Sequence, residues 1–100
     1  MRKHRLNADS VKHSATGADF YRYELPDAKI KRHGWNDGGL CPFHSDNTPG
    51  SFRINTDTGA FKCFACGTKG SDVIAFTMAL HGLNFIESLT KLTNDWGIYE

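Results

Sequence analysis

The sequence predicts an α+β fold in which a small antiparallel sheet is followed by two C-terminal helices. Residues 51–64 alternate apolar and polar side chains on both sides of a turn, as a β-hairpin does. Residues 72–81 and 85–96 instead repeat apolar side chains every three or four positions, which is typical of helices. With 100 residues and 39% hydrophobic content, the chain has room for one domain with a modest core, and such domains commonly need a cross-link.

The first 18 residues differ in character from the remainder of the chain. They are polar, contain Ser, Asn and several basic residues, and show no apolar periodicity. We therefore expect a flexible basic leader over residues 1–18 and a folded domain over residues 19–100. Within that domain, the basic run at residues 29–33, ended by Gly34, is a candidate for a short first strand.

The hairpin is expected between residues 51 and 64. Phe52 and Ile54 would share one face of its first strand, because side chains along a strand alternate between faces. Asp57-Thr58-Gly59 supplies the turn. The second strand would then end near Cys63 and hold this side chain in a fixed position.

Two helices are expected after the hairpin. Ser71 can cap the first, which would run over residues 72–81 and stop at Gly82. The second would begin after Asn84, whose pairing with Glu87 is typical of a capping box. Its apolar stripe is expected to pack against the hairpin, with a groove for a partner helix as the alternative.

Two pairs of potential metal ligands flank the hairpin: Cys41-Pro-Phe-His44 and Cys63-Phe-Ala-Cys66. Two residues separate the ligands of each pair, which is the spacing at which one turn of chain presents two side chains to one tetrahedral zinc ion. The two pairs use all three cysteines of the chain, and His44 is the fourth ligand. No coordination position remains for a catalytic water, so the pattern predicts a structural Zn²⁺ site.

The alternative for these residues is a disulfide with one spare cysteine and a surface histidine. The odd number of cysteines argues against it, and no hydrophobic signal segment precedes the domain, so we expect a reducing cytoplasmic location. The remaining histidines do not lie at ligand spacing from a cysteine: His4, His13, His33 and His81. No apolar run approaches the ~18 residues that a membrane helix needs.

Charge is distributed unevenly along the chain, although the formal net charge is only +1. Residues 1–70 contain eleven Lys/Arg and seven Asp/Glu, whereas residues 71–100 contain one and four. A polyanion would therefore meet the first two thirds of the chain. The alternative is that these are ordinary solvated basic side chains with no polyanion partner. Charge alone favours this alternative.

Four short motifs surround the predicted ligands: Gly39-Leu-Cys-Pro-Phe-His44, Thr48-Pro49 with Ser51-Phe52, Phe61-Lys-Cys-Phe-Ala-Cys-Gly67, and Gly70-Ser-Asp72. Together with residues 82–89 they resemble the Cys-His-Cys-Cys zinc-binding domain of bacterial DNA primases. The resemblance covers roughly residues 20–97. It implies a zinc-ribbon-like sheet with helices beside it, and it implies that Cys41, His44, Cys63 and Cys66 are the zinc ligands.

The resemblance also implies a partner. In primases this domain engages single-stranded template DNA and helps to choose the start site, while a separate polymerase domain performs the chemistry. On this analogy the template would meet basic residues on or near the sheet: Lys31, Arg32, Arg53, Lys62 and Lys69. Trp35 lies in a polar, glycine-flanked stretch and is the best candidate for base stacking, with a lid over the hairpin as its alternative. We expect four other rings to pack around the zinc ligands: Phe43, Phe52, Phe61 and Phe64.

The sequence departs from the family pattern at several positions. Gly50 interrupts the usual Thr-Pro-Ser-Phe run and reshapes the loop after the first ligand pair. Asp37 stands where an aromatic residue is common, Asn47 where lysine is frequent, and Ala65 replaces a glycine. The departures at 37 and 47 weaken the assignment of individual DNA contacts.

Two functions follow from these observations. The first is a DNA-binding module that acts in the DNA replication of a mobile element or phage. The second is a protein-interaction module that targets or mimics a replication or defence protein, such as a primase or helicase, and the acidic C-terminal helix favours it. The acidic residues are scattered, and the glycines form no Walker-type loop. We therefore expect no enzyme activity from this chain alone, although it can be an accessory to primer synthesis.

Overall fold

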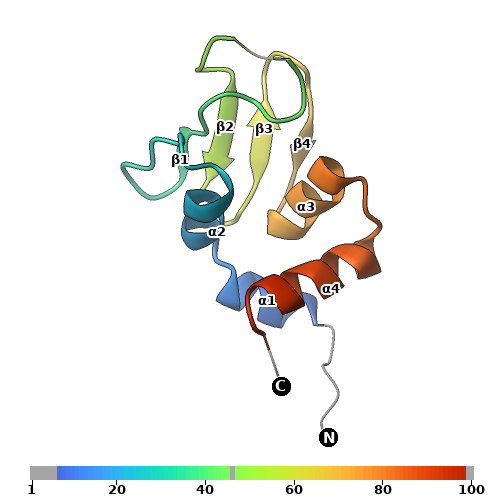
Figure 1. Cartoon of the computed structure of the whole chain (residues 1–100). Coiled ribbons are helices and arrows are strands. Elements are labelled where there is room, and N and C mark those ends of the chain that lie inside the picture. Colours follow the sequence, from blue (N-terminus) through green and yellow to red (C-terminus); the bar gives the residue numbers. More distant parts are fainter. Residues whose placement is uncertain (1–6, 46, 99–100) are drawn as a thin grey trace, which may run out of the picture.

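The computed structural model describes residues 7–45 and 47–98. This part of the chain forms four helices and a four-stranded antiparallel sheet of order β1-β2-β3-β4. Figure 1 shows the sheet with α2 and α3 beside it and with α1 and α4 side by side beneath. The bounds are α1 Ala8–Ser14, α2 Gly17–Glu24, β1 Trp35–Asp37, β2 Phe52–Asn55, β3 Phe61–Cys63, β4 Lys69–Gly70, α3 Val73–His81 and α4 Phe85–Asp95. The predicted α+β architecture is confirmed.

The register of the sheet places charged residues in one row across all four strands. Arg53 of β2 lies between Asp37 of β1 and Lys62 of β3, and Lys69 of β4 pairs with Lys62. Directly paired residues lie on the same face of a sheet. The row therefore occupies one face, which we call the outer face.

The opposite face of the sheet carries the hydrophobic core. Phe52 and Ile54 are fully buried, and so are Phe61 and Cys63 of β3. Phe76 of α3 lies at the centre of a ring cluster: its centroid is 5.2–6.4 Å from those of Phe20, Tyr21, Phe43, Phe52 and Phe61. Most of these ring pairs meet edge to face, an arrangement that aromatic quadrupoles favour.

The expected flexible leader is wrong from residue 8 onward. Helix α1 begins there, with two backbone N–H groups donating to the side chain of Asn7, and it buries Val11. Ala15 is buried as well, and α2 follows almost at once. The sequence did not predict these two helices, because helices of seven and eight residues show little periodicity and depend on tertiary packing. Residues 1–6 lie outside the described residues.

Gly17 explains how closely α2 approaches the sheet. A Cβ atom at this position would lie 2.6 Å from the carbonyl oxygen of Thr56. Only glycine permits that approach at the first residue of the helix. The approach fixes the distance between α2 and the chain that leaves β2.

The first strand is displaced from its predicted position. Residues 29–33 were expected to form it, but β1 lies at Trp35–Asp37, and Lys29 makes only an isolated bridge to Asp37. β1 is extended by its pairing with β2 rather than by an apolar pattern of its own. The short β4 was not expected either, and its two residues show no periodicity.

The two predicted C-terminal helices are present. Asp72, not the expected Ser71, caps α3 by accepting a backbone N–H, and Gly82 ends that helix in the left-handed region with φ 64°. The capping box of Asn84 and Glu87 at the start of α4 is confirmed. Within residues 7–45 and 47–98, no single helix is long and apolar enough to cross a membrane. α3 and α4 meet that test only as a pair bent by 107°.

Tyr21 joins α2 to the hairpin turn and offers a test of this packing. Its buried hydroxyl donates a 2.6 Å hydrogen bond to the carbonyl oxygen of Gly59. Burial raises the pKa of Tyr21 well above its usual range, so the hydroxyl stays a donor. We expect Tyr21→Phe to lower the free energy of unfolding by about 1–3 kcal/mol, because the substitution leaves a buried carbonyl without its donor.

Urea unfolding of the zinc-loaded protein measures this change. Tyr23→Phe is the matched control, because Tyr23 is 73% exposed on the same helix. That substitution should change the free energy of unfolding by no more than about 0.5 kcal/mol. Equal effects of the two substitutions would contradict the role given to the Tyr21 hydroxyl.

Candidate metal centre and outer sheet face

Two separate chain segments bring the four predicted ligands together. Cys41 and His44 lie in the loop before β2, Cys63 ends β3, and Cys66 lies in the turn before β4. One ligand atom from each side chain lies within 4.8 Å of the others. The Sγ atoms of Cys41 and Cys66 are 3.9 Å apart, and Cys63 Sγ is 3.9 Å from His44 Nδ1.

These separations fit tetrahedral coordination of zinc. A tetrahedral ion with Zn–S bonds of about 2.3 Å holds two sulfur ligands about 3.8 Å apart. The observed Sγ–Sγ distance of 3.9 Å agrees with that value. Three thiols and one imidazole are also a ligand set that suits Zn²⁺. Four protein ligands complete the tetrahedron, so the ion at this site would be structural.

Backbone and side-chain donors support the sulfur atoms. The N–H of Phe43 donates to Cys41 Sγ at 3.4 Å, and the N–H of Cys66 donates to Cys63 Sγ at 3.5 Å. The Cys66 thiol donates to the hydroxyl oxygen of Thr68 at 3.3 Å, and the hydroxyl can donate in return once the thiol has lost its proton. Such donors stabilise thiolates and fix the orientation of metal ligands.

The metal-free thiols differ in acidity. Burial raises the pKa of the Cys41 thiol to about 12. Hydrogen bonds from the side chain and backbone of Thr68 lower the pKa of Cys66 to about 6. A thiol must lose its proton to bind zinc. Cys66 is therefore prepared for ligation by its neighbours, whereas Cys41 depends on the ion itself to stabilise its charge.

Four of the six predicted DNA contacts lie on the outer face of the sheet. Arg53, Lys62 and Lys69 belong to the cross-strand row, and Trp35 is 49% exposed at the start of β1. The burial pattern of β1 alternates, with Asn36 buried, so Trp35 projects away from the core. A hollow of about 260 Å³ is lined by Trp35, Arg53, Lys62 and Phe64. Trp35 and Lys62 also border a second hollow of about 460 Å³, towards β4.

Phe64 does not pack around the zinc ligands as expected. Its ring is 68% exposed, and Lys62 Nζ lies 4.7 Å from the ring centroid in a cation–π contact. Phe43, Phe52 and Phe61 do pack together as expected. The missed signal was the strand period: Cys63 points into the core, so its neighbour Phe64 points outward with Lys62.

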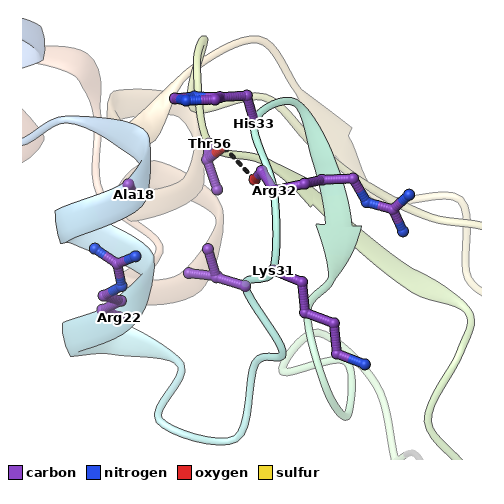
Figure 2. Close-up of a pocket in the computed structure, with 7 residues that line it drawn as sticks. Ala18, Arg22, Lys31, Arg32, His33 and Thr56 are labelled. Carbon is purple, nitrogen blue, oxygen red and sulfur yellow. Dashed lines mark hydrogen bonds between the residues drawn. The ribbon is translucent and has the colours of Figure 1, made fainter.

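Lys31 and Arg32 lie away from the row, in the loop that precedes β1. Figure 2 shows this loop beside α2, where Arg22 faces it across a cavity of about 310 Å³. The predicted contacts thus fall into two groups, one on the outer face and one at the β1 edge. Arg22 was not predicted, because nothing in the sequence indicated that α2 would pack beside this loop.

Comparison with known proteins agrees with this geometry. A protein-family model described as CHC2 zinc finger matches residues 8–99. DNA primases from Listeria monocytogenes, Rickettsia prowazekii and Geobacillus stearothermophilus are 44%, 46% and 33% identical over 66, 69 and 95 residues. These alignments cover 66%, 69% and 95% of this chain. The chain spans only 10–16% of the length of these relatives.

A solved structure shows the same fold. The structure of the Aquifex aeolicus primase, described as containing zinc-binding and RNA polymerase domains, matches with a TM-score of 0.70 at 29% sequence identity. The match covers 89% of this chain and 21% of that chain.

The ligand set is tested by His44→Ala. Changes to residues that merely support a ligand commonly lower metal affinity 10–100-fold. We therefore expect loss of this imidazole to lower zinc affinity by more than ~100-fold and to expose the core, because the ion's binding energy contributes to folding. Competition with a chromogenic chelator measures the affinity, and near-UV circular dichroism reports the packing of the rings.

His81→Ala is the matched control, since His81 is exposed at the end of α3. It should retain one zinc ion per chain with unchanged affinity. Retention of full zinc affinity by His44→Ala would exclude His44 as a ligand.

Proposed function

The chain belongs to the CHC2 zinc-finger family of DNA primases, and from this premise we propose that it is a zinc-stabilised module that binds single-stranded DNA. Zinc is held by Cys41, His44, Cys63 and Cys66 and acts as a structural ion. The observation that carries the proposal is the outer face of the sheet, where cations and exposed rings share one surface.

Charge is the first property of that surface that favours DNA. Neighbouring strands lie about 4.8 Å apart, so Arg53, Lys62 and Lys69 extend over roughly 10 Å of the outer face. Cations that contact phosphates release condensed counterions, and this supplies much of the affinity for nucleic acids. The row contains one carboxylate, that of Asp37, which pairs with Arg53 at the β1 end.

Exposed aromatic rings are the second property. Trp35 and Phe64 border the same hollow, which Arg53 and Lys62 also line. Stacking of a base on an exposed ring is worth about 1–3 kcal/mol and tolerates any base. The surface thus pairs phosphate attraction with base stacking, and both favour a single strand whose bases are accessible.

We further propose that the chain does not synthesise primers by itself. Nucleotidyl transfer needs carboxylates that hold magnesium against the nucleotide phosphates. Within the described residues, the Cys-His-Cys-Cys cluster is the one group of three or more potential metal ligands. Its four ligands fill a tetrahedron. An accessory role in primer synthesis fits these features.

The setting we propose is the DNA replication of a mobile element or phage, in the cytoplasm, alongside a primase, helicase or other replication protein. The second candidate function is a protein-interaction module without affinity for DNA. The observation that favours it is an apolar patch at the start of α4, where Phe85 is 46% and Ile86 57% exposed. The two functions differ in how binding responds to salt.

Fluorescence anisotropy of labelled single-stranded DNA with the zinc-loaded protein tests the proposal. Wild-type affinity should fall steeply as salt rises. In a plot of the logarithm of the binding constant against the logarithm of the salt concentration, each phosphate that the protein neutralises adds about 0.7 to the downward slope. We expect Trp35→Ala to weaken binding by about 1–3 kcal/mol through the loss of one stacking platform. Lys62→Gln should lower both the affinity and the salt slope.

Phe85→Ala is the matched control for Trp35→Ala, because the two rings are similarly exposed, at 46% and 49%. It should leave DNA binding unchanged. Absence of wild-type binding even at low salt would reject the DNA-binding function and favour the protein-interaction module.

A further inference from the structure

A cavity of about 310 Å³ lies at the β1 edge of the sheet, between α2 and the loop of residues 30–33. Arg22 and Ala18 line it from the helix and Thr56 from the chain after β2, and the loop supplies the other wall. In Figure 2 the side chains of Lys31 and Arg32 extend from the loop on the side away from α2, whereas Arg22 lies across the cavity. Basic side chains therefore border the loop on both sides.

A buried amide holds this loop in place. Asn36 is only 1% exposed, and its Oδ1 accepts the backbone N–H groups of Lys31 at 2.9 Å and Arg32 at 3.3 Å. Its Nδ2 donates to the carbonyl oxygens of Arg32 and Gly34 at 2.9 and 3.0 Å. Buried networks whose members all have partners rigidify the backbone around them. The loop therefore presents its cations from a fixed backbone, although it has no regular secondary structure.

Thr56 adds a further connection to the same loop. Its hydroxyl lies 3.4 Å from the carbonyl oxygen of Arg32 (Figure 2). The same hydroxyl lies 3.3 Å from the carbonyl oxygen of Gly34. Thr56 N also donates to the Gly34 oxygen, at 2.9 Å. Because Gly17 brings α2 directly against Thr56, the helix and the loop share one anchoring point. The position of Arg22 relative to the loop is thereby set.

The charges around the cavity are only partly compensated. His33 Nδ1 lies 3.2 Å from Asp57, and Arg22 is 3.9 Å from Asp19 in an exposed pair that contributes little. Among the described residues, no carboxylate lies within ion-pair distance of Lys31 or Arg32. The edge thus carries surplus positive charge where a phosphate oxygen can approach.

This edge is continuous with the outer face. The loop leads through Gly34 directly into Trp35, which borders both hollows of that face. We propose that the cavity and the loop beside it form a second subsite for the DNA strand, which takes two backbone phosphates, one at Arg22 and one at Arg32, beyond the bases stacked at Trp35. The proposal deepens the proposed function and rests on it. It assigns Arg22 and Arg32 to phosphate binding and leaves base stacking to the sheet.

The subsite predicts a dependence on strand length. An oligothymidylate of about 4 nucleotides can occupy the outer face alone, whereas one of about 12 nucleotides reaches the edge as well. We expect Arg22→Gln combined with Arg32→Gln to reduce the logarithmic salt slope for the long strand by about 1.4, or about 0.7 for each phosphate that is no longer neutralised. The slope for the short strand should not change, and Lys62→Gln should lower the affinity for both strands.

Lys91→Gln is the control for the loss of positive charge, because Lys91 lies on α4 and pairs with Asp95. It should change neither slope. The zinc content and circular dichroism of each variant check that the fold is retained, which we expect because Arg22 and Arg32 are exposed. Titration with a free nucleoside triphosphate tests the other source of a phosphate group.

Three outcomes overturn the subsite. Equal losses for short and long strands would place both arginines on the main binding surface, and no loss for either strand would remove them from binding. If the double variant lost affinity for the free triphosphate alone, the cavity would be a site for a nucleotide and not for a DNA strand. These results differ from failure of the proposed function itself, in which the wild-type protein binds neither strand.

Discussion

Convergence of four ligands on one zinc ion is the constraint on which this small fold depends. The strands have two to four residues and the helices seven to eleven, lengths at which neither element is stable alone. Structural zinc sites contribute about 10–16 kcal/mol of binding free energy. The whole free energy of unfolding of a typical domain is only about 5–15 kcal/mol. Zinc binding is therefore large enough to decide whether the domain folds.

The same constraint determines which side chains face solvent. Cys63 must point towards the ion and the core, where it is fully buried. Side chains alternate along a strand, so Lys62 and Phe64 must then point outward. Pairing with β2 adds Arg53 to the same face. A register shift of one residue would exchange the two faces and remove a ligand, so the metal centre and the outer face cannot vary independently.

The features that the sequence predicted correctly are those encoded within short stretches. The hairpin, the two helices after it and the clustering of the four side chains predicted as ligands each depend on a local period or spacing. β1 and the leader helices could not be predicted this way, because β1 is extended by its pairing with β2 and α1 is stabilised by the burial of Val11. The edge cavity was missed for the same reason: α2, which carries Arg22, and the loop of residues 30–33 are brought together only by tertiary packing. The outward position of Phe64 was available from the strand period, but its aromatic character favoured a buried interpretation.

The like charges of the cross-strand row destabilise the free domain. Arg53 lies directly opposite Lys62, and Lys62 lies opposite Lys69. Like charges in directly opposed positions destabilise a sheet, and the contact of Lys62 with the Phe64 ring offsets only part of that repulsion. A sheet selected for stability alone would alternate the signs of these charges. A bound polyanion removes the repulsion by placing phosphates over the row, so the arrangement that weakens the free domain strengthens the complex we propose.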